Sequence, residues 1–243
     1  MKKLILFALI IVPVIAGFAG CIFVNFSESS AVTGIGDPEK FEIKVDGYSG
    51  IRTAGFCEIH YYAAPSDTVI LEIQPNLREY FIIEVINDDL VVRPTRWINP
   101  ETTPILTVST PVLNRLSLDG VGAFTAYDTI NTSSFTLKLS GTGKGKAELD
   151  VTIFNAELSG AGSFELSGRA ETADISMSGA GEINALPLDT SEARIRLSGT
   201  GSVKISCSNY LYVKADGMGS VEYIGSPHID LNTSGLVRVN RLR

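Results

Sequence analysis

Several short segments of this 243-residue sequence carry residue types that could do chemistry. The segment Gly141-Thr142-Gly143-Lys144-Gly145-Lys146 combines glycines with lysines, as phosphate-binding loops do. It lacks the spacing of a Walker loop and the helix that would have to follow, and it stands in register with six similar turns that have no lysine. We therefore interpret it as a glycine turn with two solvated lysines.

Metal sites are not expected from the sequence. Calcium-binding glycine repeats need an aspartate in every short repeat, because the metal takes several oxygen ligands. Here Asp119 and Asp216 stand alone. The two histidines, His60 and His228, belong to different parts of the chain and have no neighbouring ligand set. We expect no metal, no cofactor and no histidine-based catalysis.

Charged residues on an outer face could serve a polysaccharide lyase or hydrolase, which works with clustered carboxylates and a basic residue. Lys138, Glu157, Arg196 and Lys214 occupy such positions. They include no pair of carboxylates, and opposite charges on neighbouring strands also form ion pairs that keep a sheet soluble. We expect no catalytic residue, and a polysaccharide-acting enzyme remains the alternative.

A polar residue stands immediately before each glycine turn. Four of these residues are serines and the two outer ones are aspartates: Asp119, Ser140, Ser159, Ser178, Ser198 and Asp216. Short polar side chains at such positions hydrogen-bond the backbone of the turn. We expect this structural role for the column, and a stripe that contacts a ligand is the alternative.

These residues belong to one phrase, apolar-x-apolar-(Ser/Asp)-Gly-x-Gly, which occurs seven times between Leu116 and Val239 with the last copy incomplete. From first glycine to first glycine the steps are 21, 19, 19, 20, 18 and 18 residues, a period typical of solenoids. Glycine accepts positive φ without steric cost, so we expect the pairs to form tight corners. The corner glycines are Gly120, Gly122, Gly141, Gly143, Gly160, Gly162, Gly179, Gly181, Gly199, Gly201, Gly217 and Gly219.

Apolar and polar residues alternate on both sides of each corner, which predicts strands with one buried face. Each repeat is then strand, corner, strand and a looser corner that carries the length variation. An antiparallel meander and a parallel β-helix both satisfy this pattern. The β-helix is favoured because like residues align into inward columns, one of which is Leu118, Leu139, Leu158, Met177, Leu197 and Ala215. Seven stacked coils predict a rod about 30 Å long.

Residues 1–26 have the layout of a signal peptide, with two lysines before an apolar run. The run ends in Phe18-Ala19-Gly20-Cys21, which resembles a bacterial lipobox in which Cys21 is lipidated, although Phe18 replaces the usual leucine. An uncleaved N-terminal membrane anchor and simple secretion are the alternatives. All three place the rest of the chain outside the cytoplasm, and residues 27–40 form a polar tether.

Residues 41–112 predict further strands without the glycine phrase. Because an open solenoid end exposes apolar core and unpaired backbone, we expect this region to be the N-terminal coils and cap of one continuous fold with the repeat coils of residues 113–243. Cys57 lies in the first region and Cys207 in the second. We expect both cysteines to be buried small side chains. A disulfide between them, which an exported protein could form, is the alternative.

The sequence resembles the bacterial family of auto-transporter adhesins with a head GIN domain. The likeness rests on Phe41-x-Ile43-x-Val45-x-Gly47, Asn76-Leu77, Asp89-Leu90-Val91-Val92, Thr110-Pro111-x-Leu113 and the recurrent Leu-Ser-Gly-x-Gly, and it covers about residues 41–240. The resemblance implies a parallel β-helix on a cell-envelope protein, often a lipoprotein, with a role in adhesion and no established chemistry. Gly145 departs from the pattern because neighbouring repeats place an inward apolar residue there, so we expect a thin spot in the core.

The sequence thus predicts an all-β, single-stranded parallel β-helix that acts as a non-catalytic exported adhesin or envelope-binding protein. The formal net charge of −7 argues against a nucleic-acid partner. We expect a membrane contact through the N-terminal lipid or anchor, and a surface glycan or another envelope protein as the ligand. A scaffold or sensor partner of an envelope signalling protein is the alternative role.

Overall fold

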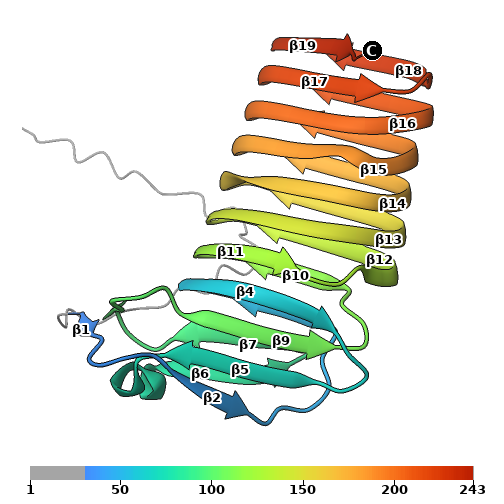
Figure 1. Cartoon of the computed structure of the whole chain (residues 1–243). Helices are drawn as coiled ribbons and strands as arrows, with labels where there is room; N and C mark the ends of the chain where they lie inside the picture. The colour runs from blue at the N-terminus through green and yellow to red at the C-terminus, as the bar shows by residue number, and fades with distance from the viewer. Residues whose placement is uncertain (1–30, 243) are drawn as a thin grey trace, which may run out of the picture.

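The structure, a computed structural model, describes residues 31–242. Its strands form a seventeen-stranded sheet that winds around one hydrophobic core, and a separate two-stranded sheet (Figure 1). The expected targeting segment of residues 1–26, with Cys21, lies outside the described residues. Within residues 31–242, no helix is long and apolar enough to cross a membrane.

Short strands and one 3₁₀ helix make up the N-terminal part. They are β1 (Val32–Thr33), β2 (Glu39–Ile43), β3 (Gly50–Thr53), β4 (Phe56–Ala63), β5 (Thr68–Ile73), η1 (Pro75–Tyr80), β6 (Phe81–Ile86), β7 (Asp89–Pro94), β8 (Ile98–Asn99) and β9 (Ile105–Thr110).

The glycine repeats form the stacked coils of the upper part of Figure 1. Their strands are β10 (Arg115–Leu118), β11 (Val121–Ala126), β12 (Ile130–Leu139), β13 (Thr142–Leu158), β14 (Ala161–Met177), β15 (Ala180–Leu197), β16 (Thr200–Ala215), β17 (Met218–Ile224), β18 (His228–Thr233) and β19 (Leu236–Arg241).

Each coil has two faces joined by the glycine corner on one edge and the looser corner on the other. We call the sheet that follows the glycine corner the first face; it contains β11, the first halves of β13 to β16, β17 and β19. The second face contains β10, β12, the second halves of β13 to β16, and β18. Side chains directed between the two faces form the core.

The predicted parallel β-helix is confirmed, and the antiparallel meander is excluded for the repeats. Every pairing between successive coils is parallel, and Leu118, Leu139, Leu158, Met177, Leu197 and Ala215 align with one another in register. All of them are buried, with relative exposures of 2% or less.

The looser corners do not interrupt the strands, although the sequence indicated two separate strands in each repeat. β13, β14, β15 and β16 run through this corner as single strands of 17, 17, 18 and 16 residues. The differences in repeat length appear there as register shifts, between Glu165 and Gly168, between Ala185 and Asp189, and between Thr190 and Glu192. The glycine corner and both faces keep their register.

The glycine corners depend on close stacking more than on positive φ. Among the corner glycines only Gly181 and Gly219 have positive φ, at 153° and 144°. A Cβ on Gly160 would instead collide with the carbonyl oxygen of Gly141, the equivalent residue one coil earlier, and the other first glycines repeat this contact. Glycine is required because successive backbones approach too closely for a side chain.

The thin spot expected at Gly145 is absent, and this expectation was wrong. Gly145 lies between Phe124 and Phe164 in register. The Phe164 ring fills the space, since a Cβ on Gly145 would lie 2.6 Å from Cδ1 of that ring. The glycine and the large aromatic residue are complementary, and Phe164 is 2% exposed.

The N-terminal strands continue the stacking and then cover its end. β3 and β4 pair in parallel with β10 and β11, and β7 and β9 pair in parallel with β3 and β4. Beyond them the pairing becomes antiparallel, β2 with β5, β5 with β9, and β6 with β7 (lower part of Figure 1). These antiparallel strands share one buried cluster with the repeat coils.

The described part of the segment 27–40 lies against this N-terminal region. β1 pairs with β8, and the backbone N–H of Ile35 donates a hydrogen bond to Asn76 Oδ1 at 2.9 Å. Gly34 packs on the buried side chain of Gln74. The described end of the segment is therefore fixed to the fold.

One prediction tests the inward column. Leu158 lies between Leu139 and Met177, so Leu158→Asp would bury an unpaired carboxylate and lower the free energy of unfolding by more than about 4 kcal/mol. Glu157→Ala on the outward side of the same strand is the control, with an expected loss of about 0.5 kcal/mol or less. Chemical denaturation measures both losses, and equal losses would contradict the alternation of buried and exposed residues.

A second prediction tests the stacking of the corners. Gly160→Ala places a methyl group on the Gly141 carbonyl, so we expect a loss of about 1–3 kcal/mol or more in the free energy of unfolding. Gly47→Ala is the matched control, because its Cβ would make an ordinary contact with Asp67 Oδ2 at 3.5 Å. Thermal unfolding that is unchanged in Gly160→Ala would show that the corners have room for a side chain.

Candidate binding groove

A long open groove crosses successive coils on the second face. It has a volume of about 1320 Å³ and extends from β3 and β7 across β10, β12, β13 and β14 to β15. A smaller hollow of about 380 Å³ adjoins it on the side of the glycine corners. The polar side chains that line the groove include Arg52, Asp89, Arg115, Ser117, Asp119, Thr136, Lys138, Ser140, Asn155, Glu157, Asp174, Ser176 and Arg196.

The parallel register produces this lining. Ser117, Lys138, Glu157, Ser176 and Arg196 occupy one position in five successive strands. Because side chains alternate between the two sides of a strand, the buried columns on either side of this position force it outward. The groove therefore displays one outward side chain per coil at the spacing of neighbouring strands.

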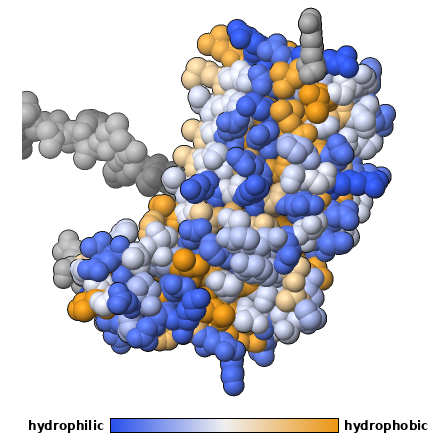
Figure 2. Space-filling model, in the orientation of Figure 1, coloured by the Kyte–Doolittle hydropathy of each residue, from blue (hydrophilic) through white to orange (hydrophobic). Residues whose placement is uncertain are grey.

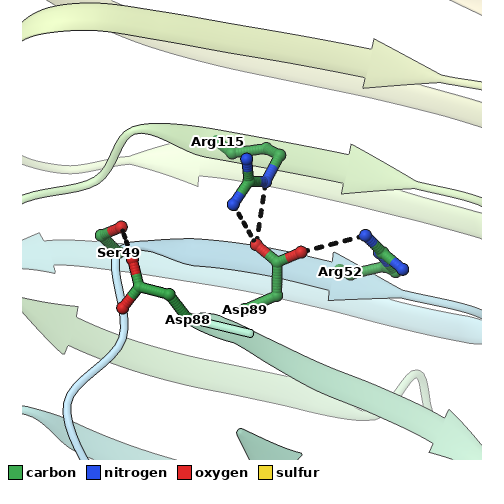
Figure 3. A network of polar contacts seen from close by, with 5 residues as sticks. All are labelled: Ser49, Arg52, Asp88, Asp89 and Arg115. Carbon is green, nitrogen blue, oxygen red and sulfur yellow. Dashed lines mark hydrogen bonds and ion pairs between the residues drawn. The ribbon is translucent and has the colours of Figure 1, made fainter. Parts of the chain in front are cut away.

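At its N-terminal end the groove contains a charged cluster (Figure 3). Asp89, whose side chain is 7% exposed, accepts hydrogen bonds from Arg52 Nη2 at 3.0 Å and from Arg115 Nε at 2.8 Å. Arg115 Nη2 lies 2.8 Å from the same Oδ1 atom of Asp89. Both carboxylate oxygens are engaged, so this aspartate joins the three strands β3, β7 and β10.

The sequence analysis did not predict this cluster, although Asn87-Asp88 is a local signal for the turn that precedes Asp89. Asn87 and Asp88 have positive φ, 50° and 67°, and form the two-residue turn between β6 and β7. Ser49 contacts the Asp88 carboxylate, and the backbone N–H groups of Ser49 and Gly50 donate to the Asp88 carbonyl at 3.1 and 3.0 Å. Gly50 has no side chain, which leaves space for the Asp89 carboxylate.

Charges along the rest of the groove are also paired. Lys138 Nζ lies 2.9 Å from Glu157 Oε2, and Arg196 Nη1 lies 2.5 Å from Asp174 Oδ1. The groove lining contains four basic residues (Arg52, Arg115, Lys138, Arg196) and four acidic residues (Asp89, Asp119, Glu157, Asp174). These charged side chains carry no net charge, and the groove offers both hydrogen-bond donors and acceptors.

The polar column borders the groove. Ser140 Oγ donates to the Asp119 carboxylate at 2.5 Å, and Ser159 Oγ donates to the Leu139 carbonyl at 3.4 Å. Asp119 and Ser140 line the main groove, while Ser159 and Ser178 line the smaller hollow. Ser198 and Asp216 continue the column beyond both.

The other residues considered for chemistry lie apart from the groove. Lys144 and Lys146 are exposed on the first face, in a strand. His60 lies 2.9 Å from Glu58 Oε1, whereas His228 stacks on Tyr210 on β16. Within residues 31–242, no three His, Cys, Asp or Glu side chains are grouped as a metal site.

Cys57 and Cys207 are free and buried, on β4 and β16. Burial raises the pKa of the Cys57 thiol to about 12 and also raises the pKa of Cys207. Both side chains therefore remain protonated, unreactive thiols at neutral pH.

Comparisons with known proteins agree with this architecture. The family model described as "Putative auto-transporter adhesin, head GIN domain" matches residues 47–227. Comparison with curated proteins gives no match.

Several solved structures share the fold. A putative adhesin from Bacteroides fragilis has a TM-score of 0.82 and 20% identity, with 87% of this chain and 100% of that chain covered. A putative lipid binding protein from Parabacteroides distasonis has a TM-score of 0.70 and 20% identity, with 88% and 100% covered. A putative adhesin from Parabacteroides merdae has a TM-score of 0.65 and 21% identity, with the same coverage.

At these identities the solved structures establish the fold, whereas the family model spans most of the sequence itself. The protein therefore belongs to the auto-transporter adhesin family with a head GIN domain.

Proposed function

We propose that the protein is a non-catalytic, exported and lipid-anchored adhesin that binds an elongated, uncharged polar polymer, such as a surface glycan, in the groove of the second face. The observation that carries this proposal is the groove itself, which is long, open and continuous across successive coils. A polymer laid along it meets one polar outward side chain of this row at each coil.

The charge distribution of the groove favours a hydroxyl-rich neutral ligand. Its four basic and four acidic side chains balance, and those of the central ion pairs are already engaged with each other. A polyanion would meet carboxylates as often as cations. Hydroxyl groups can both donate to carboxylates and accept from lysine or arginine, so they suit a lining that contains both donors and acceptors.

The same contacts support a binding role without turnover. Glycoside cleavage needs two carboxyl groups placed on either side of the scissile bond. Asp89 is held by two arginines, Glu157 by Lys138 and Asp174 by Arg196. Binding to each module is weak in this proposal and is strengthened by many tethered copies at one surface, because tethering raises the effective concentration.

Binding in the groove can be tested with a blocking substitution. Ser176 lies outward in the groove, so Ser176→Tyr should fill it and weaken binding to neutral glycans on a carbohydrate array by about tenfold or more. Ser163→Tyr is the matched control, since Ser163 lies on the first face of the same strand. Weaker glycan binding in Ser163→Tyr alone would place the binding site on the first face. Release of new reducing ends from a bound glycan would show that the protein is an enzyme and would contradict the adhesin proposal.

The lipid anchor requires a separate test. The proposal places the lipid on Cys21, which follows Ala19-Gly20 at the end of the apolar run. In Cys21→Ser, metabolic labelling with a radioactive fatty acid should lose the acyl signal, and the precursor should remain unprocessed or leave the membrane fraction. Unchanged labelling and membrane association would support an uncleaved N-terminal anchor.

A further inference from the structure

Within the described part of the chain, the last coil leaves part of the core uncovered. Ile229 and Leu231 on β18 continue the columns of Leu211 and Val213, and Val239 on β19 continues the column of Val221. Val213 is fully buried, whereas Leu231 is 51% exposed. In Figure 2, hydrophobic and strongly hydrophilic surface lie side by side at this end.

Within residues 31–242, no strand pairs with the outer edge of this coil. The N–H groups of Ser234 and Leu236 donate to the carbonyls of Ala215 and Gly217 in the preceding coil, at 2.9 and 3.0 Å. Since backbone groups alternate in direction along a strand, residues 229 and 231 on β18 and residues 237 and 239 on β19 point their N–H and C=O groups away from the rod. Such an edge is a template for pairing with another strand.

We propose that this edge pairs with the same edge of a second copy, so that two rods join end to end by their C-terminal coils. A twofold axis parallel to the strands places β18 of each copy on β19 of the other, in antiparallel orientation. The opposite end of the rod is covered by antiparallel strands and offers no matching coil. The contact is therefore closed, and it makes a dimer and not a filament.

Side-chain chemistry selects one register. With Asp230 opposite Arg238 of the second copy, Ile229 meets Val239 and Leu231 meets Val237, and these apolar pairs are the ones that exchange backbone hydrogen bonds. Asp230 and Arg238 then form a non-hydrogen-bonded pair, in which side chains lie closest together. Each dimer contains this ion pair twice.

Other arrangements are less favourable. A shift by two residues in one direction sets Ile229 against Arg241, and a shift in the other direction sets Asp230 against Leu236. Placing β18 on β18 of the second copy around residue 230 opposes two aspartates, which repel each other. Asp230 and Arg238 are both exposed, and within residues 31–242 Arg238 makes no ion pair.

The dimer would place its two N-terminal regions at opposite ends of a rod of double length. If both are anchored as proposed above, the rod links two surfaces, which is a direct form of adhesion. The pairing itself does not depend on the ligand of the groove. Failure of glycan binding would therefore leave it intact, and failure of pairing would leave the groove proposal intact.

Charge reversal tests the ion pair. In sedimentation velocity of the full chain in mild detergent, Asp230→Arg and Arg238→Asp should each weaken self-association by about tenfold or more, because each change makes both ion pairs repulsive. An equal mixture of the two variants should associate like the wild type, since attraction is restored in the mixed dimer. Lys214→Asp, exposed one coil away, is the control with the same change in net charge as Arg238→Asp.

Cross-linking tests the register. Leu231→Cys mixed with Val237→Cys should form a disulfide-linked dimer under mild oxidation, whereas each variant alone should not. Cross-linking of Leu231→Cys alone would mean that β18 pairs with itself and would overturn the proposed arrangement. A wild-type chain that sediments as a monomer at every concentration, or association that ignores both charge reversals, would overturn the dimer and leave the edge to a strand of another protein.

Discussion

The close contact between successive glycine corners is the constraint on which the rest of the structure depends. Each first glycine lies so near the carbonyl of the glycine before it that no Cβ fits. This close approach allows the residue after the first glycine to donate a backbone hydrogen bond to that carbonyl. Ala161 donates to Gly141 at 2.9 Å, and Ala180 donates to Gly160 at 3.0 Å. The corners thus stack at strand spacing, and this fixes the register of both faces.

Core and groove follow from this one register. An inward position becomes a column of apolar side chains, and the adjacent outward position becomes a row of charged and hydroxyl side chains. Opposite charges on neighbouring coils then lie close enough to pair, as Lys138 and Glu157 do. The groove therefore results from the same stacking that forms the core. The side chains that line it can vary, because the core does not constrain outward positions.

The sequence alone was sufficient for the β-helix, because period, alternation and inward columns all repeat. It was insufficient where two residues compensate each other across coils. Gly145 suggested a void only because the sequence does not show that the Phe164 ring enters the space above it. The role of glycine was likewise misassigned to positive φ, since the approach of another backbone leaves no trace in local residue types.

The partners of Asp89 in the charged cluster were missed for a related reason. Its partners Arg52 and Arg115 lie 37 and 26 positions away in the sequence. Asp89 and Arg52 belong to the region without the glycine phrase, so no repeat supplied their register relative to Arg115. The antiparallel strands that precede the repeats have the same alternation as parallel ones, so periodicity could not distinguish their direction. The groove could be anticipated only as outward charges on adjacent coils, without its N-terminal end.

The looser corners have a consequence for how such a protein changes over time. Register shifts there absorb the unequal repeat lengths, while the glycine corners on the opposite edge remain aligned. Residues can therefore be inserted or lost along one edge without disturbing core or groove, and whole coils can be duplicated because each contacts only its neighbours. The length of the rod and the residues along its looser edge can therefore change in evolution without a change of fold.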